Sequence, residues 1–320
     1  VLRKADAVEK YEKLYEVTLE AFREEYYTST GRIVSETQTG AILSLYFNLA
    51  REKDRPRILQ TLLTNIENHK NHLATGFVGT PYICHTLSEN GAHGMASTLF
   101  MREDYPSWLY SVNMGATTIW ERWDSIKPDG AFDESGMNSL NHYANGSVGD
   151  WMYRKVAGLT QLEPGYKKFK VQPMFVKGIE EAGVEFYSVY GKIESKWSCR
   201  DGKIRVKVVV PANTTAVICL PEKEGRIEVG SGIYEYEYDT ETSLAYERFS
   251  MESTLADIVA QPLAVEMFNQ FAPGMLEGPM IQFAMQMTLA EMLGAAPEAR
   301  PLYEAVVKAL NEQEKKNGEV

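Results

Sequence analysis

Cysteine, clustered positive charge and long apolar runs are all scarce in this 320-residue sequence. The three cysteines, Cys84, Cys199 and Cys219, are odd in number and far apart along the chain. That pattern is typical of neither a disulfide framework nor a zinc site. We therefore expect free thiols and no metal, and a reducing compartment such as the cytoplasm is favoured.

The charge balance excludes further classes of partner. The formal net charge is −11, without the Lys and Arg stripes that a nucleic-acid backbone requires. No apolar run approaches the roughly 20 residues that span a bilayer. We expect neither a nucleic-acid partner nor a membrane-spanning segment, while a homo-oligomer is compatible with the composition.

The N-terminal residues lack both an initiator methionine and a signal peptide. Apolar side chains already follow mainly helical spacing there, at Leu14, Tyr15, Val17, Leu19 and Phe22. These features predict a fragment that begins partway through a larger domain, and they leave the cellular location open.

The first half of the chain predicts one helix after another, including Thr39–Arg51 and Pro56–Asn68. Helices joined by loops, with hardly any strand pattern, indicate a bundle, a solenoid or a helical barrel. No fixed-period repeat is present, which disfavours a solenoid. Loops containing GFVGTP and WERW are expected at one end of the helical hairpins, where they would form the rim of a concave site.

The pattern changes at about Leu159. Short alternating segments follow, and Asp201-Gly202 is a strong hairpin signal, so an antiparallel β-sandwich of roughly seven strands is expected. Helical spacing returns from about Ser250, in a quasi-repeat whose two halves, TLADI and TLAEM, each begin with a capping box. Two helical hairpins would give a small four-helix module.

Four of the five tryptophans lie between Tyr105 and Arg154, which marks this segment as the candidate site. A long polar loop is expected between a helix at Ser107–Asn113 and a second helix from about Met137. Loops of that length in a compact domain are usually functional or disordered, and two tryptophans flanking an acid are unusual in disordered chain.

Glycosidases need paired carboxylates and aromatic faces for sugar rings, and Glu121 between Trp120 and Trp123 fits that chemistry. The residues alone leave other interpretations open: Glu121 as a salt-bridged loop residue, His142 as a core histidine, and the tryptophans as barrel core. No Gly-rich phosphate loop, Ser-His-Asp order or HExxH spacing is present, so no cofactor is expected.

Several segments together resemble the bacterial α-L-rhamnosidases of glycoside hydrolase family 78. They are GRIVSETQTG, TGFVGTPY, YPSWLYSVNMGATTIWERWDS, MNSLNHYANGSVGDWMYRKVAGL, SVYGKIESKW and VPANTTAVICLP. The resemblance implies a multidomain α and β fold: the second half of an (α/α)6 barrel over residues 1–158, an antiparallel β-sandwich over 159–241, and a small four-helix module over 242–320.

The same resemblance implies inverting hydrolysis of terminal α-L-rhamnosyl residues, with a rhamnose-containing glycoside or oligosaccharide as the partner. Glu121 falls on the family's general base and His142 on a residue that contacts the rhamnose hydroxyls. Trp120 and Trp123 are expected as sugar platforms, and Arg122 as a residue that orients Glu121 or binds a backbone carbonyl.

An inverting enzyme also needs a general acid, with roughly 6.5–9.5 Å between the two carboxyl groups. In the family this acid lies in an acidic, Arg-containing loop of the barrel's first half, and no matching segment occurs in this sequence. The 320-residue chain alone is therefore expected to be inactive.

Two other functions stay open at this point. One is a different (α/α)6 exo-glycosidase or a glycosyl phosphorylase, because this barrel carries many activities. A phosphorylase would need several basic groups near the water position, whereas Arg122 is the only one in the WERW loop. The other is a non-catalytic sugar-binding subunit.

Overall fold

The computed structural model describes residues 4–134, 136–245, 247–251, 253–277 and 281–317. The chain divides between Leu244 and Ala245 into two compact units. In the described residues, no helix has the length and apolarity needed to cross a membrane.

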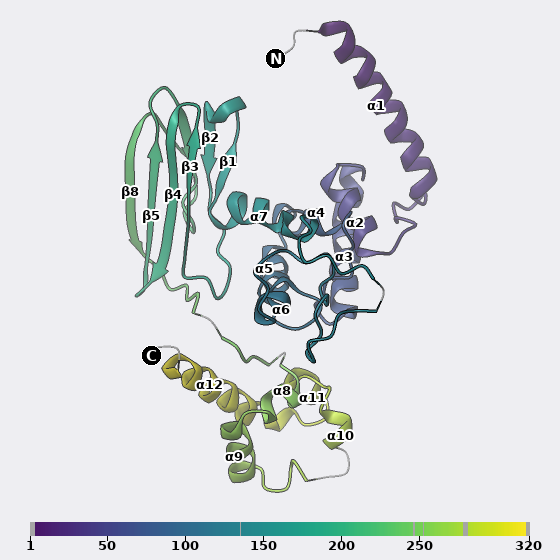
Figure 1. Ribbon diagram of the computed structural model, residues 1–320, viewed down its shortest axis with the longest axis vertical. Coiled ribbons are helices and arrows are strands. Elements are labelled where there is room, and N and C mark those ends of the chain that lie inside the picture. Colours follow the sequence, from purple (N-terminus) through teal and green to yellow (C-terminus); the bar gives the residue numbers. More distant parts are fainter. Residues whose placement is uncertain (1–3, 135, 246, 252, 278–280, 318–320) are drawn as a thin grey trace. The chain divides into compact units, whose positions relative to one another are not determined.

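The helical part of the first unit precedes its strands, as the sequence predicts (Figure 1). Its α-helices are α1 (Ala5–Tyr26), α2 (Gln38–Tyr46), α3 (Arg55–Asn68), α4 (Thr80–Glu89), α5 (His93–Met101), α6 (Trp108–Asn113) and α7 (Val148–Trp151). Shorter helical turns are η1 (Glu52–Asp54), η2 (Ala144–Ser147), the π-helical η3 (Met152–Val156) and η4 (Pro164–Tyr166).

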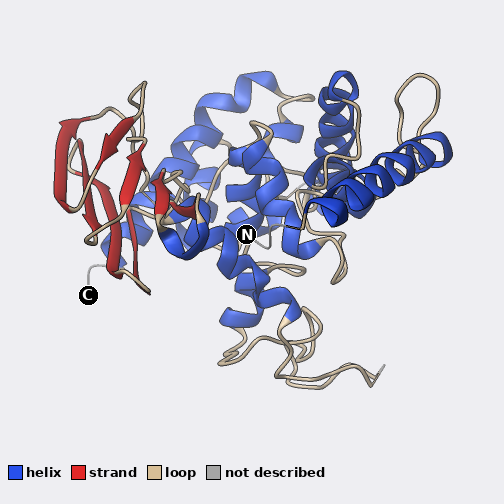
Figure 2. Ribbon diagram, turned by 90° about the horizontal axis from the view of Figure 1, so that it is seen from above, coloured by secondary structure: helices blue, strands red, loops and turns tan. Residues whose placement is uncertain are grey.

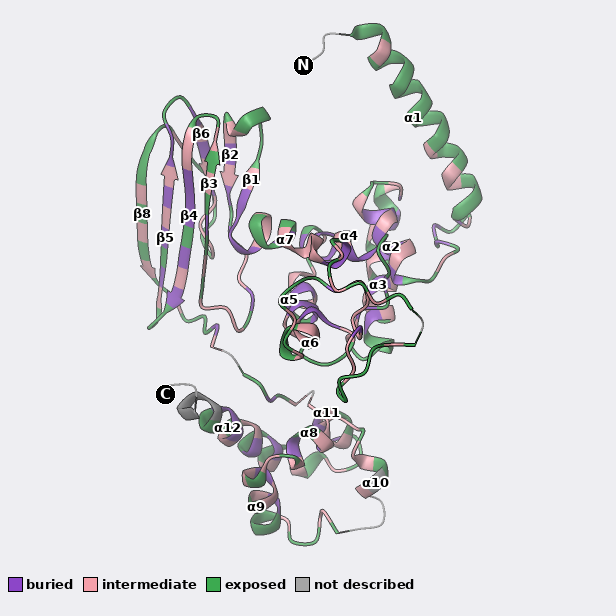
Figure 3. Cartoon of the chain, viewed as in Figure 1, coloured by how far each residue is buried: buried purple, intermediate pink, exposed green. Residues whose placement is uncertain are grey.

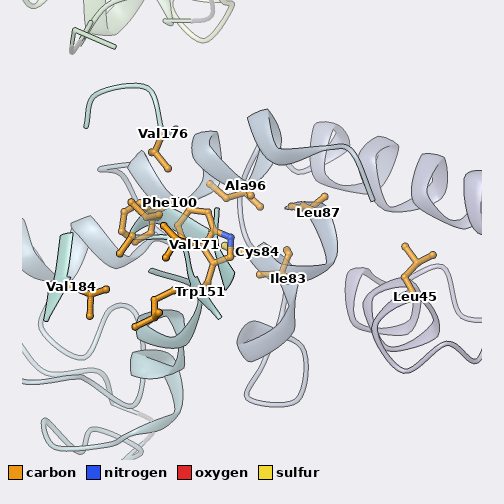
Figure 4. Packing of buried hydrophobic residues seen from close by; sticks show 14 of the residues in the cluster. Leu45, Ile83, Cys84, Leu87, Ala96, Phe100, Trp151, Val171, Val176 and Val184 are labelled. Atoms are coloured by element: carbon orange, nitrogen blue, oxygen red, sulfur yellow. The ribbon is translucent and has the colours of Figure 1, made fainter. Parts of the chain in front are cut away.

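The apolar faces of these helices form the core that their spacing predicts. In α3, Pro56 lies in the first turn, and Ile58, Leu62 and Ile66 recur at intervals of four and are fully buried. Figure 4 shows side chains of this core, with Ile83, Cys84 and Leu87 of α4 among them. The predicted helices in this half are therefore confirmed up to α6, except that α2 ends at Tyr46 and not at Arg51, since Asn48 takes a positive φ that a helix does not allow.

The helix expected from about Met137 is wrong. Helical structure begins only at Ala144, with η2. The preceding residues lie beside the segment around Ile119, and the two segments exchange backbone hydrogen bonds. Those bonds satisfy backbone groups that a helix would otherwise have paired within itself.

The β part is a sandwich of two four-stranded sheets (Figure 2). Their strand orders are β1-β2-β6-β7 and β3-β4-β5-β8. The strands are β1 (Leu159–Gln161), β2 (Lys168–Val171), β3 (Glu181–Ser188), β4 (Gly191–Arg200), β5 (Lys203–Val210), β6 (Thr215–Ile218), β7 (Ile227–Val229) and β8 (Gly232–Asp239).

The predicted hairpin at Asp201-Gly202 is confirmed, because Arg200 of β4 pairs with Lys203 of β5 and both turn residues have positive φ. The sheets depart from the purely antiparallel expectation at one pair, since β2 and β6 run parallel. A longer connection than a hairpin separates those two strands, which permits the parallel pairing.

One hydrophobic core continues from the helices into the sandwich. The indole Nε1 of buried Trp197 in β4 donates to the Val156 carbonyl oxygen of η3 at 2.7 Å, and Ser195 Oγ donates to the Ala157 carbonyl oxygen at 2.7 Å. In Figure 3 buried positions accordingly occur both in the helices and in β4 and β5. The helical part and the sandwich therefore pack as one unit.

The second unit is helical and has its own core, which includes the T-shaped pair Phe268 and Tyr303. Its described helices are α8 (Leu255–Val259), α9 (Pro262–Phe271), α10 (Ile281–Ala284), α11 (Leu289–Met292), η5 (Pro297–Ala299) and α12 (Arg300–Asn317). Both predicted capping boxes are confirmed, at Thr254 with Asp257 and at Thr288 with Glu291.

The two capped helix starts of this unit also pair with each other. Thr254 and Thr288 form an antiparallel bridge. The Leu255 amide donates to the Met287 carbonyl oxygen at 2.9 Å, and at the equivalent position the Leu289 amide donates to the Ser253 carbonyl oxygen at 3.1 Å. The quasi-repeat seen in the sequence is thus a structural repeat.

Candidate active site

Two irregular segments that are linked by backbone hydrogen bonds carry the candidate residues. The Glu121 amide donates to the Ser139 carbonyl oxygen at 2.9 Å, and the His142 amide donates to the Ile119 carbonyl oxygen at 2.8 Å. This pairing brings Glu121 and His142 onto neighbouring strands of chain, although 20 residues separate them in the sequence.

The Glu121 carboxylate is held at one oxygen. Its Oε2 accepts a hydrogen bond from the Ser139 amide at 3.1 Å. Its Oε1 has no hydrogen-bond partner among the residues that the structure describes, and the side chain is partly exposed. An ionised carboxylate has acceptor capacity on both oxygens, so Oε1 can hold and deprotonate a water.

A buried polar link lies beneath this loop. Asn145 is only 5% exposed, and its Nδ2 donates to the Trp120 carbonyl oxygen at 3.3 Å. Its own carbonyl oxygen accepts from Trp108 Nε1 at 2.8 Å. Trp120 is itself only 5% exposed, so most of its indole packs within the protein.

Trp123 and Arg122 face other partners in the loop. The half-buried Trp123 ring packs edge-on against Trp108, with 5.4 Å between the ring centroids. Arg122 Nε donates to Asp124 at 3.2 Å, and that hydrogen bond raises the pKa of Arg122. A further ion pair joins Arg122 to Asp133 at 3.5 Å. Arg122 therefore shares its charge with two loop carboxylates.

His142 lies parallel to two aromatic rings, Phe77 and Tyr143, and the sequence left Tyr143 open as a possible core residue, whereas its ring is 87% exposed. The centroid of Phe77 is 4.7 Å from that of His142, with 19° between the ring planes. Tyr143 lies 5.5 Å away at 7°. Phe77 belongs to the GFVGTP loop, so the contact joins that loop to the segment containing His142, which itself pairs with the segment around Ile119. A rim position was the only sequence feature that pointed to Phe77.

No metal centre accompanies these residues. In the described parts of the chain, no three His, Cys, Asp or Glu side chains are grouped closely enough to hold a metal ion. The three cysteines are free.

The charged surface of the sandwich contains a groove of about 830 Å³ over β3, β4, β5 and β8. Its Lys and Glu side chains pair with one another, including Lys196 with Glu185 at 2.9 Å. Beside it lies Glu194, which is 3% exposed. Burial alone raises the pKa of Glu194, but hydrogen bonds from Lys192, Lys207 and Lys196 outweigh it and lower the pKa to about 2. These mutual ion pairs indicate that the charged side chains of this face stabilise the sheet.

Two family models match this chain, and several known proteins are similar to it. The model of the bacterial α-L-rhamnosidase 6 hairpin glycosidase domain matches residues 1–156, and that of the bacterial α-L-rhamnosidase C-terminal domain matches residues 158–235. A curated α-L-rhamnosidase of Formosa agariphila is 40% identical over 69% of this chain and 24% of its own length. One from Streptomyces avermitilis is 38% identical over 66% of this chain and 20% of its own length.

Solved structures agree with these relatives. The α-L-rhamnosidase of Aspergillus terreus superposes with a TM-score of 0.71 at 35% identity, over 74% of this chain and 28% of that one. The Streptomyces avermitilis α-L-rhamnosidase complexed with L-rhamnose gives a TM-score of 0.68 at 34% identity, over 72% of this chain and 24% of that one. The chain thus spans about a quarter of the length of these relatives, and it belongs to the bacterial α-L-rhamnosidases of glycoside hydrolase family 78.

Proposed function

We propose that the complete protein containing this chain hydrolyses terminal α-L-rhamnosyl residues from glycosides or oligosaccharides, with inversion at the anomeric carbon. Glu121 acts as general base and takes a proton from water as the water oxygen bonds to that carbon. A general acid protonates the glycosidic oxygen as the old bond breaks. The names of the relatives and the L-rhamnose in one of their structures support this substrate class.

One observation carries the proposal: among the residues that the structure describes, only one of the two carboxylate oxygens of Glu121 accepts a hydrogen bond. The hydrogen bond from Ser139 orients Oε2. Oε1 can then receive the water, and backbone hydrogen bonds link the segments that carry Glu121 and His142, so in this proposal both side chains act on the same sugar. A general base takes a proton efficiently only when its oxygen is oriented towards the water, and the hydrogen bond from Ser139 supplies that orientation.

The general acid belongs to another part of the complete protein in this proposal. The 320-residue chain then supplies one of the two carboxylates and does not turn over substrate by itself. Trp123 offers a partly exposed ring for the sugar, whereas Trp120 supports the loop from beneath because it is almost fully buried.

Hydrolysis is favoured over phosphorolysis by the state of Arg122. This guanidinium is paired with Asp124 and Asp133. Two carboxylates at the same cation disfavour a third anion such as phosphate.

The test is release of 4-nitrophenol from 4-nitrophenyl α-L-rhamnoside by the complete protein, in wild type and in Glu121→Gln. The near-isosteric amide keeps the volume but removes the base. We expect kcat to fall by about 100-fold to 10,000-fold, with the rate of wild type independent of added phosphate. Nuclear magnetic resonance of the first-formed sugar reports its anomeric configuration and hence inversion.

Each competing function has its own outcome in this assay. Turnover that requires phosphate would establish the phosphorylase. Rhamnose binding without turnover by the complete protein would establish a sugar-binding subunit. An unchanged rate in Glu121→Gln would show that Glu121 is not the general base.

A further inference from the structure

The stack of Phe77, His142 and Tyr143 has a geometry that restricts what each ring can do. The imidazole is the member that lies parallel to both of the others. Rings packed on an imidazole leave its edge, with Nδ1 and Nε2, as the part that binds polar groups.

The backbone fixes which nitrogen of His142 carries the proton. The Ala144 amide donates to Nδ1 at 3.3 Å, so Nδ1 is the acceptor. In the neutral imidazole the proton is then on Nε2. The His142 amide is bonded to Ile119, so the backbone at this residue is anchored as well. Nε2 is thus a donor with a defined direction, suited to a hydroxyl oxygen of a sugar.

Exposure separates the roles of the two flanking rings. Phe77 is 41% exposed and half covered by its neighbours, whereas Tyr143 is 87% exposed. A large ring held parallel to a fixed imidazole, with most of its surface open, is a stacking platform. Phe77 limits the tilt of the imidazole from the neighbouring loop.

The different exposure of these rings indicates which one can meet the leaving group of the substrate. In hydrolysis of a terminal sugar, that sugar enters the site and the group bonded to it projects outward. Trp120 lies buried under the loop, while Tyr143 is highly exposed one residue after His142. Of these rings, Tyr143 is the one whose surface is open to a group that projects from the terminal sugar.

Resting on the rhamnosidase function above, we propose that Tyr143 is a specificity-determining residue that stacks on the leaving group, and that Phe77 is a positioning residue that acts through His142. The leaving groups favoured are those with a flat face, such as an aryl ring or the C–H face of a pyranose. A methyl group offers no such face.

The experiment compares 4-nitrophenyl and methyl α-L-rhamnoside as substrates of the complete protein, with rhamnose release as the common readout. For Tyr143→Ala we expect kcat/KM on the aryl substrate to fall about threefold to tenfold, mainly through KM, with little change on the methyl substrate. Tyr143→Phe keeps the ring and is expected to behave as wild type. Tyr187→Ala, which removes an exposed tyrosine of β3, is the matched control.

Phe77 is expected to give a different pattern, because it acts on the bond from His142 to the terminal sugar that both substrates share. Phe77→Leu should reduce kcat/KM for both by a similar factor, and Phe77→Tyr should restore it. Melting temperatures of all variants are measured alongside, so that a loss of fold is recognised.

The outcomes separate the two proposals. If wild type releases rhamnose but Tyr143→Ala lowers both substrates equally or neither, the leaving-group platform is wrong while the rhamnosidase function stands. A Phe77→Leu defect confined to the aryl substrate overturns the positioning role. If wild type releases no rhamnose from either substrate, the proposed function itself fails.

Discussion

Ser139 binds Glu121 at both ends of the residue. Its carbonyl oxygen accepts from the Glu121 amide at 2.9 Å, and its amide donates to Glu121 Oε2 at 3.1 Å. Both bonds use the backbone of Ser139, so the orientation of the carboxylate depends on the path of the chain at residue 139 and not on the serine hydroxyl.

This dependence predicts that two substitutions of Ser139 change kcat to very different extents. Ser139→Pro removes the amide donor, and we expect kcat of the complete protein on an aryl rhamnoside to fall by about 100-fold through loss of aim. Ser139→Ala keeps both backbone bonds and should stay within about threefold of wild type, since only the bond from the Asn141 amide to the hydroxyl is lost. A large defect in the alanine variant would show that the hydroxyl itself matters.

Asn145 is expected to stabilise the site from below. Asn145→Ala leaves the Trp120 carbonyl oxygen without its side-chain donor at a buried position, so we expect a loss of about 1–3 kcal/mol in the free energy of unfolding together with reduced activity. Chemical denaturation and rhamnoside turnover measure the two effects. Asn141→Ala, in the same segment but exposed, is the control and should change stability little.

The cluster around Glu194 predicts an acid-dependent stability. The pKa is about 2 in the folded protein against an ordinary value of 4.5, so the ionised form stabilises the fold above about pH 4.5. That contribution is lost as the pH falls from 4.5 towards 2, because the group then takes up a proton on the way through its folded pKa. Thermal unfolding of wild type and Glu194→Gln across this range should show a difference that is largest near neutral pH and shrinks in acid. A constant difference would contradict the assignment.

The cysteines should differ in reactivity. Burial raises the pKa of the Cys84 thiol to about 12 and also raises that of Cys199, so little thiolate exists at pH 8. Cys219 is only partly buried. Iodoacetamide labelling of native protein, followed by peptide mass spectrometry, should modify Cys219 first and the other two only after unfolding. Equal labelling of Cys84 in the native state would show that α4 opens readily.

The sequence predicted most of the architecture because its periodic segments are long. Helical spacing in α3 and strict alternation in β5 each leave one structural solution. Residues 137–143 have no such period, and their irregular, non-helical path depends on hydrogen bonds to the segment around Ile119, which local propensity cannot report. The same limit applies to β2 and β6, whose parallel pairing joins distant segments.

Candidate site residues could be predicted where they lie in a sequence motif, but contacts that depend on how the chain packs could not. Glu121 and His142 lie in recognisable segments, whereas the contact of Phe77 with His142 joins loops distant in sequence. Burial of Trp120 and the pairing of Arg122 with two aspartates likewise depend on how the loop folds back on itself. The roles of these residues stay predictions until the variants are measured.

The paired helix starts of the second unit make its two halves depend on each other. Each bond made by one half is returned by its equivalent in the other: Ala256 donates to Met285 at 3.0 Å, and Ala290 donates to Met251 at 2.8 Å. Such reciprocity is the internal counterpart of a two-fold symmetric homodimer. Because the backbone partners of each helix start lie in the other half, neither half can complete these bonds alone, and the two halves of the unit should form cooperatively.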